Sequence, residues 1–304
     1  MSLQSNHRKG PGIRRAGISI EDYEIVMLLV DIIPFIDTRK LNRIPGNSPL
    51  ISAINQLREN RFVPLLVELP SQDPSKPRVI SGFSIISKLA ELPSSSFAAY
   101  LKSPVSESTL AIGSIDEQHD IISLFHVFET TSLGFAEVRK DNRPTQMILS
   151  LRSFLSLYES GVFSSSLTLG EVASAPVFSL SRGTKFDQTL REMLRRKFRR
   201  VQIAGTRAIV SDGEVLAYLF NEDRLKKVAK SPERLLDGTL EEIEGREASW
   251  LESSRKLRDA AKDLLNKDHE TVLTDRGLIT PWDLTLKPWR LGELEIAEKP
   301  PVRK

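Results

Sequence analysis

The chain has 304 residues, of which 40% are hydrophobic and 27% are charged, with a formal net charge of +3 and no cysteine. This length is enough for two domains of ordinary size, and the composition is that of a globular protein. The absence of cysteine excludes a disulfide framework and thiolate chemistry. It is compatible with a reducing compartment, and we expect a cytoplasmic protein.

The N-terminal residues 1–22 form a polar, basic tail that we expect to be disordered. The start of the chain lacks the apolar middle of a signal peptide. The most apolar run, 25–36, contains Asp31 and Pro34 and falls short of the about 20 residues that span a membrane. We expect this run to pack on a core as a strand or helix, and we expect no membrane partner.

One short segment then occurs four times, and we call it the repeated segment. It has two apolar residues, a hydroxyl residue, two variable positions, a polar residue and then mostly apolar residues. The copies are 79–86, 148–155, 209–216 and 278–285. Their hydroxyl residues stand at 81, 150, 211 and 280, so the steps are 69, 61 and 69 residues. This long, short, long spacing predicts a tandem repeat arranged as a pair of pairs.

Each copy predicts a strand that runs into a helix. The apolar pair suits a buried strand end, and the Ser or Thr that follows is a good helix N-cap. The polar residue three positions later lies where a capping box places its second partner. These polar residues are Ser84, Ser153, Glu214 and Asp283.

Three further elements are predicted upstream of each copy. Apolar residues at i, i+3, i+4 and i+7 predict helices at 50–57, 121–128, 186–193 and 257–264. Strands are predicted before these helices, at 40–44, 110–115, 176–180 and 248–251, and after them, at 63–67, 135–138, 201–203 and 271–273. In the last unit, the short separation at 274–276 predicts a tight hairpin. Each unit is therefore strand, helix, strand, strand, helix.

The predicted fold class is α/β (α+β), with four βαββα units in two pseudo-twofold pairs. A lone unit of about 60 residues is marginal, because it buries only about 60% of its unfolded surface, so we expect units to pair face to face. The first pair spans 23–162, with unit 1 at about 38–95 and unit 2 at about 105–160. The second pair spans 163–295, with unit 3 at about 165–230 and unit 4 at about 238–292. Residues 296–304 form a C-terminal tail.

The repeated unit resembles the CBS motif, which occurs in pairs called Bateman modules. Such pairs are found in cystathionine β-synthase, inosine monophosphate dehydrogenase, chloride channels and the γ subunit of AMP-activated kinase. The hallmark of the family is Gly, two apolar residues, Thr or Ser, two variable residues and Asp, and 277–283 matches it throughout. Unit 3 has Ala208 for the Gly and Glu214 for the Asp, while units 1 and 2 lack both. The resemblance covers about 38–292.

The resemblance implies a non-catalytic regulatory protein, a ligand sensor that binds AMP, ADP or ATP in the clefts of the second pair. In the family, the hydroxyl and the helix N-terminus face phosphate, the acid accepts the ribose hydroxyls and apolar strand residues enclose adenine. Carried over, Thr280 and Asp283 serve one cleft and Ser211 and Glu214 the other. The phosphate would also meet Arg199 and Arg200, and the adenine would meet Pro176, Val177, Phe178, Trp250 and Leu251.

Simpler interpretations exist for these residues. Thr280 and Ser211 would cap any helix at this turn, Asp283 and Glu214 complete capping boxes, and Trp250 is of a type usual in cores. Because units 1 and 2 have serine where the family has an acid, we expect the first pair to bind nucleotide poorly or not at all. Its expected role is structural, or that of an interface with a partner.

A dense basic cluster lies within 191–200. It consists of Arg191, Arg195, Arg196, Lys197, Arg199 and Arg200. It is either a solvated helix end, a phosphate site, or, as the least favoured interpretation, a nucleic-acid contact.

No catalytic motif or metal-ligand spacing is present among the four histidines, so we expect neither enzyme activity nor a required cofactor. The expected partners are an adenine nucleotide, an unidentified protein and a second copy of the chain. The main alternative is a scaffold or oligomerisation module with vestigial clefts. The identity of the nucleotide, and competition by S-adenosylmethionine, stay open.

Overall fold

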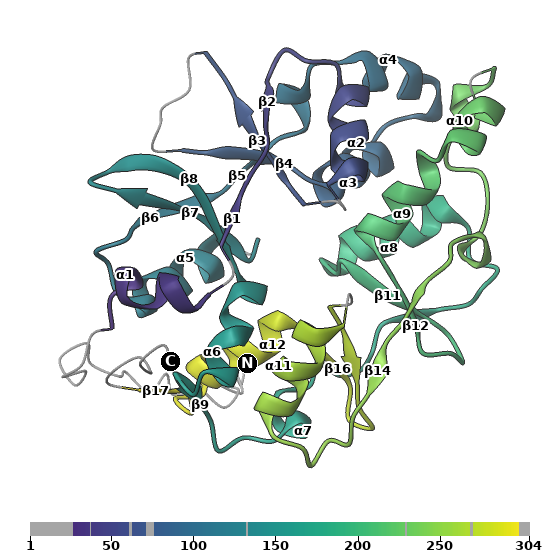
Figure 1. The fold of residues 1–304 in the computed structure, drawn as a ribbon. Coiled ribbons are helices and arrows are strands. Elements are labelled where there is room, and N and C mark those ends of the chain that lie inside the picture. Colours follow the sequence, from purple (N-terminus) through teal and green to yellow (C-terminus); the bar gives the residue numbers. More distant parts are fainter. Residues whose placement is uncertain are drawn as a thin grey trace, which may run out of the picture.

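The computed structural model describes residues 27–36, 38–60, 63–70, 76–131, 133–228, 230–267 and 270–297. The predicted N-terminal tail lies outside these residues, as does the end of the predicted C-terminal tail. The four units form a ring in the spatial order 1, 2, 4, 3, so that unit 1 lies beside units 2 and 3 (Figure 1). Their element order confirms the predicted α/β fold of four βαββα units.

Units 1 and 2 have the predicted order of strand, helix, strand, strand and helix. Unit 1 has β2 (Arg43–Pro45), α2 (Leu50–Glu59), β3 (Leu65–Glu68), β4 (Arg78–Ile80) and α3 (Gly82–Glu91). Unit 2 has β6 (Gly113–Asp116), α5 (Ile121–Thr131), β7 (Phe135–Lys140), β8 (Arg143–Ser150), the 3-10 turn η5 (Leu151–Phe154) and α6 (Leu155–Glu159). Between the two units lie η3 (Ser94–Ser96), α4 (Phe97–Lys102), η4 (Val105–Ser108) and β5 (Leu110–Ala111).

Units 3 and 4 repeat this order. Unit 3 has β10 (Ser179–Leu180), α8 (Phe186–Arg196), β11 (Arg200–Ile203), β12 (Ala208–Ser211) and α9 (Asp212–Leu219). Unit 4 has β14 (Ser249–Trp250), α11 (Leu257–Asn266), β15 (Val272–Leu273), β16 (Leu278–Ile279) and α12 (Pro281–Arg290). The linking elements are α1 (Leu29–Ile32), η2 (Ile33–Phe35), β1 (Arg39–Lys40), β9 (Phe163–Ser164), α7 (Leu169–Val172), α10 (Glu222–Val228), η6 (Pro232–Arg234), η7 (Leu240–Glu242), β13 (Arg246–Glu247) and β17 (Glu295–Ile296).

The segment before the first helix of each unit differs from the single strand predicted there. In three units it holds two short strands that belong to different sheets. Strand β1 pairs with β8 of unit 2, β5 with β4 of unit 1 and β13 with β12 of unit 3, always antiparallel. In the remaining unit only Ser179–Leu180 forms a strand, and a single bridge joins Ser174 to Leu278 of unit 4. Each sheet is thus completed by the segment that leads into the partner unit, a long-range pairing that local periodicity does not encode.

The helix starts of the repeated segments confirm the predicted caps. Ser81, Ser150, Ser211 and Thr280 are N-caps with extended backbone, and each completes a capping box with the residue three positions later. Because every copy ends its strand at this cap, the four helices begin at equivalent places in the four units. Their N-termini carry unpaired N–H groups and partial positive charge, so these groups also recur at equivalent places around the ring.

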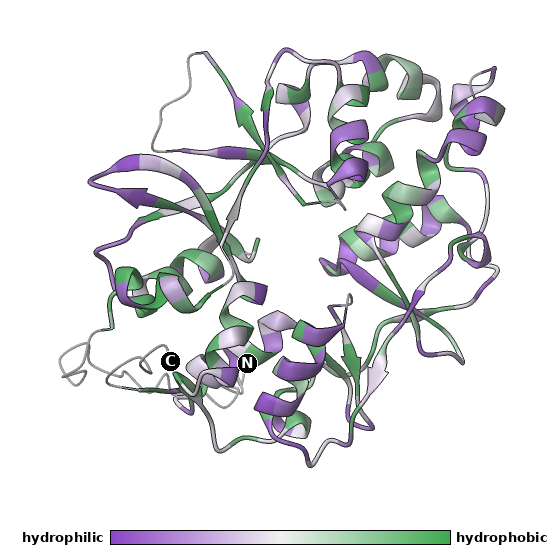
Figure 2. Ribbon diagram, viewed as in Figure 1, coloured by the Kyte–Doolittle hydropathy of each residue, from purple (hydrophilic) through white to green (hydrophobic). Residues whose placement is uncertain are grey.

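Two large cores hold the ring together, and both cross the boundary between the pairs. One joins helices of unit 1 to those of unit 3, and it includes Ile54 on α2 and Leu190 on α8, both fully buried. The other joins α5 and α6 of unit 2 to α11 and α12 of unit 4, and α1 packs into it as predicted for the run 25–36. Smaller clusters join the sheets of units 1 and 2 and those of units 3 and 4. Hydrophobic and hydrophilic residues alternate along the helices (Figure 2), as expected of helices that bury one face.

One hydrogen bond links units 2 and 4 through this second core. The Tyr158 hydroxyl donates to the carbonyl of Leu284 at 2.6 Å, and Tyr158 is 2% exposed. Pro288 stands inside α12, one turn after Leu284, and has no N–H to donate to that carbonyl. Tyr158 therefore supplies the donor that the helix lacks, and burial raises the pKa of its hydroxyl well above the ordinary value.

We expect Tyr158→Phe to lower the free energy of unfolding by about 1–3 kcal/mol, because the Leu284 carbonyl would stay buried without a donor. Denaturant unfolding followed by circular dichroism measures this change. In a Pro288→Ala background the helix regains its own N–H, so Tyr158→Phe should cost less there. An equal cost in both backgrounds would contradict this role of the hydroxyl.

Candidate functional site

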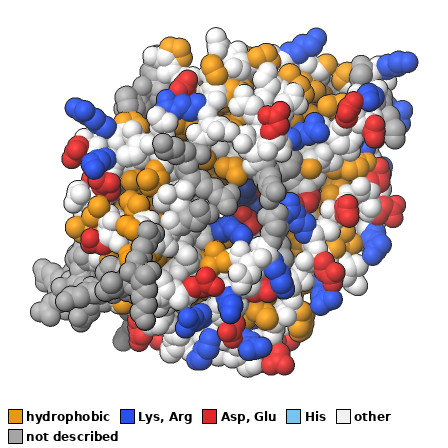
Figure 3. All heavy atoms as spheres, in the orientation of Figure 1, with side chains coloured by type: hydrophobic (Ala, Val, Ile, Leu, Met, Phe, Trp, Pro, Cys, Tyr) orange, Lys and Arg blue, Asp and Glu red, His pale blue; other side chains and the backbone are white. Residues whose placement is uncertain are grey.

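A cavity of about 430 Å³ lies where residues of all four units meet. Gly82 of unit 1, Ser150 of unit 2, Ser211 of unit 3 and Thr280 of unit 4 all line it. Each of these residues is the N-cap of its repeated segment or the residue after the cap. In the space-filling view, Lys and Arg side chains gather around the middle of this face (Figure 3). The repeat thus brings equivalent helix starts to one shared site.

The helix starts make this cavity suitable for an anion. Helix α9 begins beside Ser211 and α12 beside Thr280, so both direct N-terminal N–H groups and the positive ends of their dipoles toward this region. The hydroxyls themselves are engaged with their capping-box acids: Thr280 Oγ1 donates to Asp283 Oδ2 at 2.8 Å, and Ser211 Oγ donates to Glu214. A ligand would therefore meet hydroxyls that already have partners.

The charged side chains that line the cavity are four arginines and three acids. They are Arg152, Arg199, Arg200, Arg246, Asp212, Glu214 and Glu270. Positive charges therefore outnumber negative charges by one. Such a lining attracts an anion, although each ligand must compete with the carboxylates already present.

Two of these arginines, Arg199 and Arg200, pair with acids of the same cavity. Arg199 donates to Asp212 Oδ2 through Nε at 3.2 Å and Nη2 at 2.7 Å. Arg200 Nη2 donates to Glu270, which belongs to unit 4. The two arginines predicted to bind phosphate therefore do line the cavity, and each already donates to a carboxylate.

Arg246 and Arg152 make the other arginine contacts of the cavity. Arg246 Nε lies 2.7 Å from Glu214 Oε1, and Arg152 Nη2 donates to the carbonyl of Lys267 at 3.4 Å. Arg152 comes from unit 2 and Lys267 from unit 4, so this contact crosses between the two pairs. The cavity is therefore lined by charge from units 2, 3 and 4.

The two equivalent acids of the second pair have different surroundings. Asp283 is 2% exposed, and its Oδ2 accepts from Thr280 N and Oγ1, both at 2.8 Å. Its Oδ1 accepts from Ser174 Oγ at 2.7 Å and lies 2.8 Å from Lys287 Nζ. A ribose could reach this carboxylate only by displacing a protein donor. The assignment of Asp283 to ribose stays a prediction.

Glu214 is the more accessible of the two acids. Its side chain is 16% exposed and lines the cavity. Glu214 Oε2 accepts from Ser211 N at 2.9 Å, while Oε1 meets Arg246, whose side chain is half exposed. An arginine at this position can swing toward solvent more readily than Lys287, whose side chain is 27% exposed.

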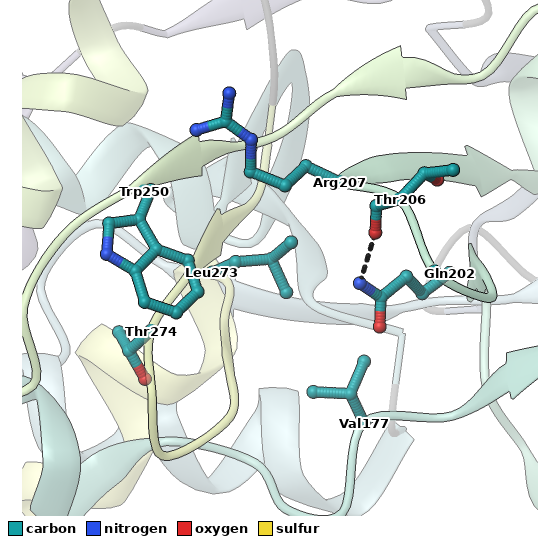
Figure 4. A pocket seen from close by; sticks show the side chains of 8 residues that line it. Val177, Gln202, Thr206, Arg207, Trp250, Leu273 and Thr274 are labelled. Atoms are coloured by element: carbon teal, nitrogen blue, oxygen red, sulfur yellow. Dashed lines mark hydrogen bonds between the residues drawn. The ribbon is translucent and has the colours of Figure 1, made fainter.

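A second pocket of about 510 Å³ lies between units 3 and 4 (Figure 4). Two residues predicted to flank adenine, Val177 and Trp250, line it together with Gln202, Thr206 and Leu273. Gln202 Nε2 donates to the Thr206 carbonyl at 2.6 Å, and Trp250 is 48% exposed. Its lining shares no residue with that of the cavity where Ser211 and Thr280 lie.

No protein-family model matches the chain, and no curated protein matches it. Among solved structures, a Methanocaldococcus jannaschii protein described as a candidate archaeal homologue of g-AMPK superposes with a TM-score of 0.73. The two sequences are 18% identical, and the match covers 85% of this chain and 99% of that one. The chain has the fold of a tandem CBS protein.

Two other solved structures are similar over different lengths. An uncharacterized conserved protein of Pyrococcus horikoshii matches 85% of this chain and 98% of its own, at 14% identity and a TM-score of 0.49. A CBS domain protein of Pyrobaculum aerophilum, solved in complex with AMP, matches 42% of this chain and 90% of its own, at 14% identity and a TM-score of 0.32.

Three other residues predicted for the adenine site line neither pocket. Pro176 follows a cis peptide bond and is exposed. Phe178 packs under the Arg196 guanidinium, whose central carbon lies 4.9 Å from the ring centroid. Leu251 packs against the core shared by units 2 and 4. Their assignment to adenine in this CBS fold stays a prediction.

The basic cluster divides into two parts. Arg195 and Arg196 both donate to Glu192, and Arg191 lies 3.7 Å from Asp187. These arginines lie on the exposed face of α8, as expected of a solvated helix end. Within the cluster, only Arg199 and Arg200 line the central cavity. Helix α8 therefore ends in surface arginines that pair with acids, while Arg199 and Arg200, which follow the helix, line the central cavity.

Sequence reasoning missed several polar residues of the cavity, and these include Ser150, Arg152, Asp212, Arg246 and Glu270. Ser150 and Arg152 stand in the repeated segment of unit 2 at positions equivalent to Ser211 and Gly213 of unit 3. Their place in the repeat is a usable signal, which the missing acid of unit 2 obscures. Arg246 and Glu270 lie outside the repeated segments, and no pattern marks them.

The described ranges contain neither a metal cluster nor a membrane-spanning helix. No three His, Cys, Asp or Glu side chains there are grouped to hold a metal ion. In the same part of the chain, no helix is both long and apolar enough to cross a bilayer.

We expect Asp283→Asn to lower the free energy of unfolding by about 2–4 kcal/mol, because Lys287 would lose its buried counter-ion. The matched control is Glu214→Gln at the equivalent position of unit 3. Its partner Arg246 is half exposed, so the expected loss is below about 1 kcal/mol. Denaturant unfolding of both variants tests this difference. Equal losses would show that Asp283 is no more structural than Glu214.

Proposed function

We propose that this CBS-fold protein is a non-catalytic regulatory protein that binds an adenine nucleotide, AMP, ADP or ATP, in its second pair. The phosphates would enter the central cavity. The observation that carries the proposal is this cavity, in which helix N-termini and four arginines face one space. The adenine class of the ligand rests on the resemblance to the CBS family.

Arg199 and Arg200 would bind the phosphate. A guanidinium offers two forked N–H donors to an oxyanion, and a charge-assisted bond of this kind is stronger than a neutral one. Both arginines already donate to carboxylates, so a phosphate can take the same geometry by exchange. The N-termini of α9 and α12 would add backbone donors and a favourable dipole.

Glu214 is the better placed acid for the ribose. It lines the cavity, and its Oε1 meets the half-exposed Arg246. Asp283, the acid of the family hallmark, would have to release Lys287 or Ser174 first. The geometry therefore favours a site centred on unit 3, with Asp283 as a second, less accessible position.

The cavity also offers a route from binding to regulation. Its lining comes from all four units, and the Arg199 guanidinium lies over the Phe83 ring of unit 1, 5.7 Å from the centroid. A ligand that engages Arg199 would alter this contact between the pairs. The ligand shifts the docking of the two pairs only to the extent that it binds one docked arrangement more tightly than another. A protein partner would sense that shift.

The second candidate function is a scaffold whose clefts are vestigial. Two observations favour the scaffold function. Asp283 already accepts hydrogen bonds from protein donors, and Arg199 and Arg200 already pair with acids. These groups therefore have partners without any ligand. This function predicts an interface with a partner or a second copy, and no saturable nucleotide binding.

We expect AMP and ATP to bind the full chain saturably below millimolar concentration, and Arg200→Ala to weaken both by about tenfold or more through loss of a charge-assisted bond. Equilibrium dialysis with labelled nucleotides measures the affinity, and ligand-induced rises in melting temperature support it. The control is Arg191→Ala, which removes the same charge from the exposed face of α8 and should change affinity by less than about twofold. Absence of saturable binding would leave the scaffold function.

A further inference from the structure

Glu270 differs from the other acids of the central cavity in what it does for the fold. Glu214 completes the capping box of α9, and Asp212 pairs with Arg199 inside unit 3. Glu270 belongs to unit 4, where it precedes β15, and its carboxylate accepts from Arg200 of unit 3. In the described part of the chain, no backbone N–H donates to it. Its side chain is about half exposed, so no local packing requirement explains its position.

The electrostatic surroundings of Glu270 are those of a bound anion. Desolvation by the surrounding protein acts to raise its pKa, but the charges of Arg200, Arg199 and Arg152 outweigh this and hold the pKa below its usual range. The carboxylate is therefore ionised at neutral pH. It faces three of the four arginines of the cavity.

A carboxylate and a phosphate make the same demand on an arginine. Both are oxyanions that accept the forked N–H donors of a guanidinium. Because Arg200 donates to Glu270, a phosphate cannot take that donor while the carboxylate stays in place. The half-exposed side chain can leave without opening the core, since it caps no helix.

We propose that Glu270 is a built-in competitor for the phosphate group of the ligand. It occupies the anion position on Arg200 when no ligand is bound, and the ligand displaces it. This inference rests on the proposed function, because it names the group against which the nucleotide must compete. Glu270 thereby weakens binding, whereas Arg199 and Arg200 strengthen it.

The test is binding of ATP, of UTP as a comparison without adenine, and of inorganic tripolyphosphate to the full chain, by isothermal titration in a buffer free of phosphate and sulfate. Glu270→Gln keeps the shape of the side chain and removes its charge. We expect ATP and tripolyphosphate to bind about tenfold more tightly to this variant. The matched control is Glu192→Gln, which removes an arginine-paired glutamate outside the cavity and should change affinity by less than about twofold.

A double variant tests whether the gain in affinity depends on Arg200. In Glu270→Gln with Arg200→Ala, most of the gain should vanish, because the freed donor is gone. Unchanged or weaker binding by Glu270→Gln would overturn the proposal. A gain that persists without Arg200 would overturn it too. The melting temperature without ligand shows that each variant is folded.

Failure of this inference is distinguishable from failure of the proposed function. If the natural chain binds ATP and Glu270→Gln binds it no better, the competitor is disproved and the proposed function stands. If Glu270→Gln binds tripolyphosphate more tightly but ATP no better than UTP, the competitor stands and the adenine preference fails. If no variant binds any of these anions, both fail.

Discussion

The structure depends on the burial of one apolar helix face per unit. A unit of this size cannot bury that face alone, and the exchange of strands between sheets leaves the helices still uncovered. Units 1 and 3 solve the problem with one shared core, and units 2 and 4 with another. Units 1 and 2 meet through their sheets, as do units 3 and 4, so the four units close into a ring (Figure 1). Closure of the ring brings the four helix starts together, and the cavity is a consequence of it.

Local signals in the sequence predict the elements well, for physical reasons. The stripes at 50–57, 121–128, 186–193 and 257–264 are the buried faces of α2, α5, α8 and α11. The hydroxyl of each repeated segment caps a helix because a short side chain at that turn satisfies a free N–H. Both features are encoded within a few residues. The division of the segment before the first helix of a unit into two short strands is not encoded locally. It depends on which partner sheet lies nearby.

The candidate site was predictable only in part. Ser211, Glu214, Thr280, Arg199 and Arg200 do line one cavity, and their positions in the repeat pointed to them. The sequence suggested two separate clefts, however, and placed the first pair outside the site. Ser150 and Arg152 line the same cavity because the ring brings unit 2 to the same space as unit 3. The arrangement of the units in a ring follows from the packing of helices that are far apart in the sequence. A repeat pattern does not specify which helices pack together.

The difference between Asp283 and Glu214 shows how one repeat position can serve two purposes. Both side chains close a capping box, so both retain the local role that the motif requires. At Asp283 the second oxygen is committed to Lys287 and Ser174 in a nearly dry setting, where exchange of partners is costly. At Glu214 the second oxygen meets an arginine that solvent can reach, so exchange costs less. Within the second pair, the unit that departs from the CBS hallmark is therefore the one whose acid can change partners more readily.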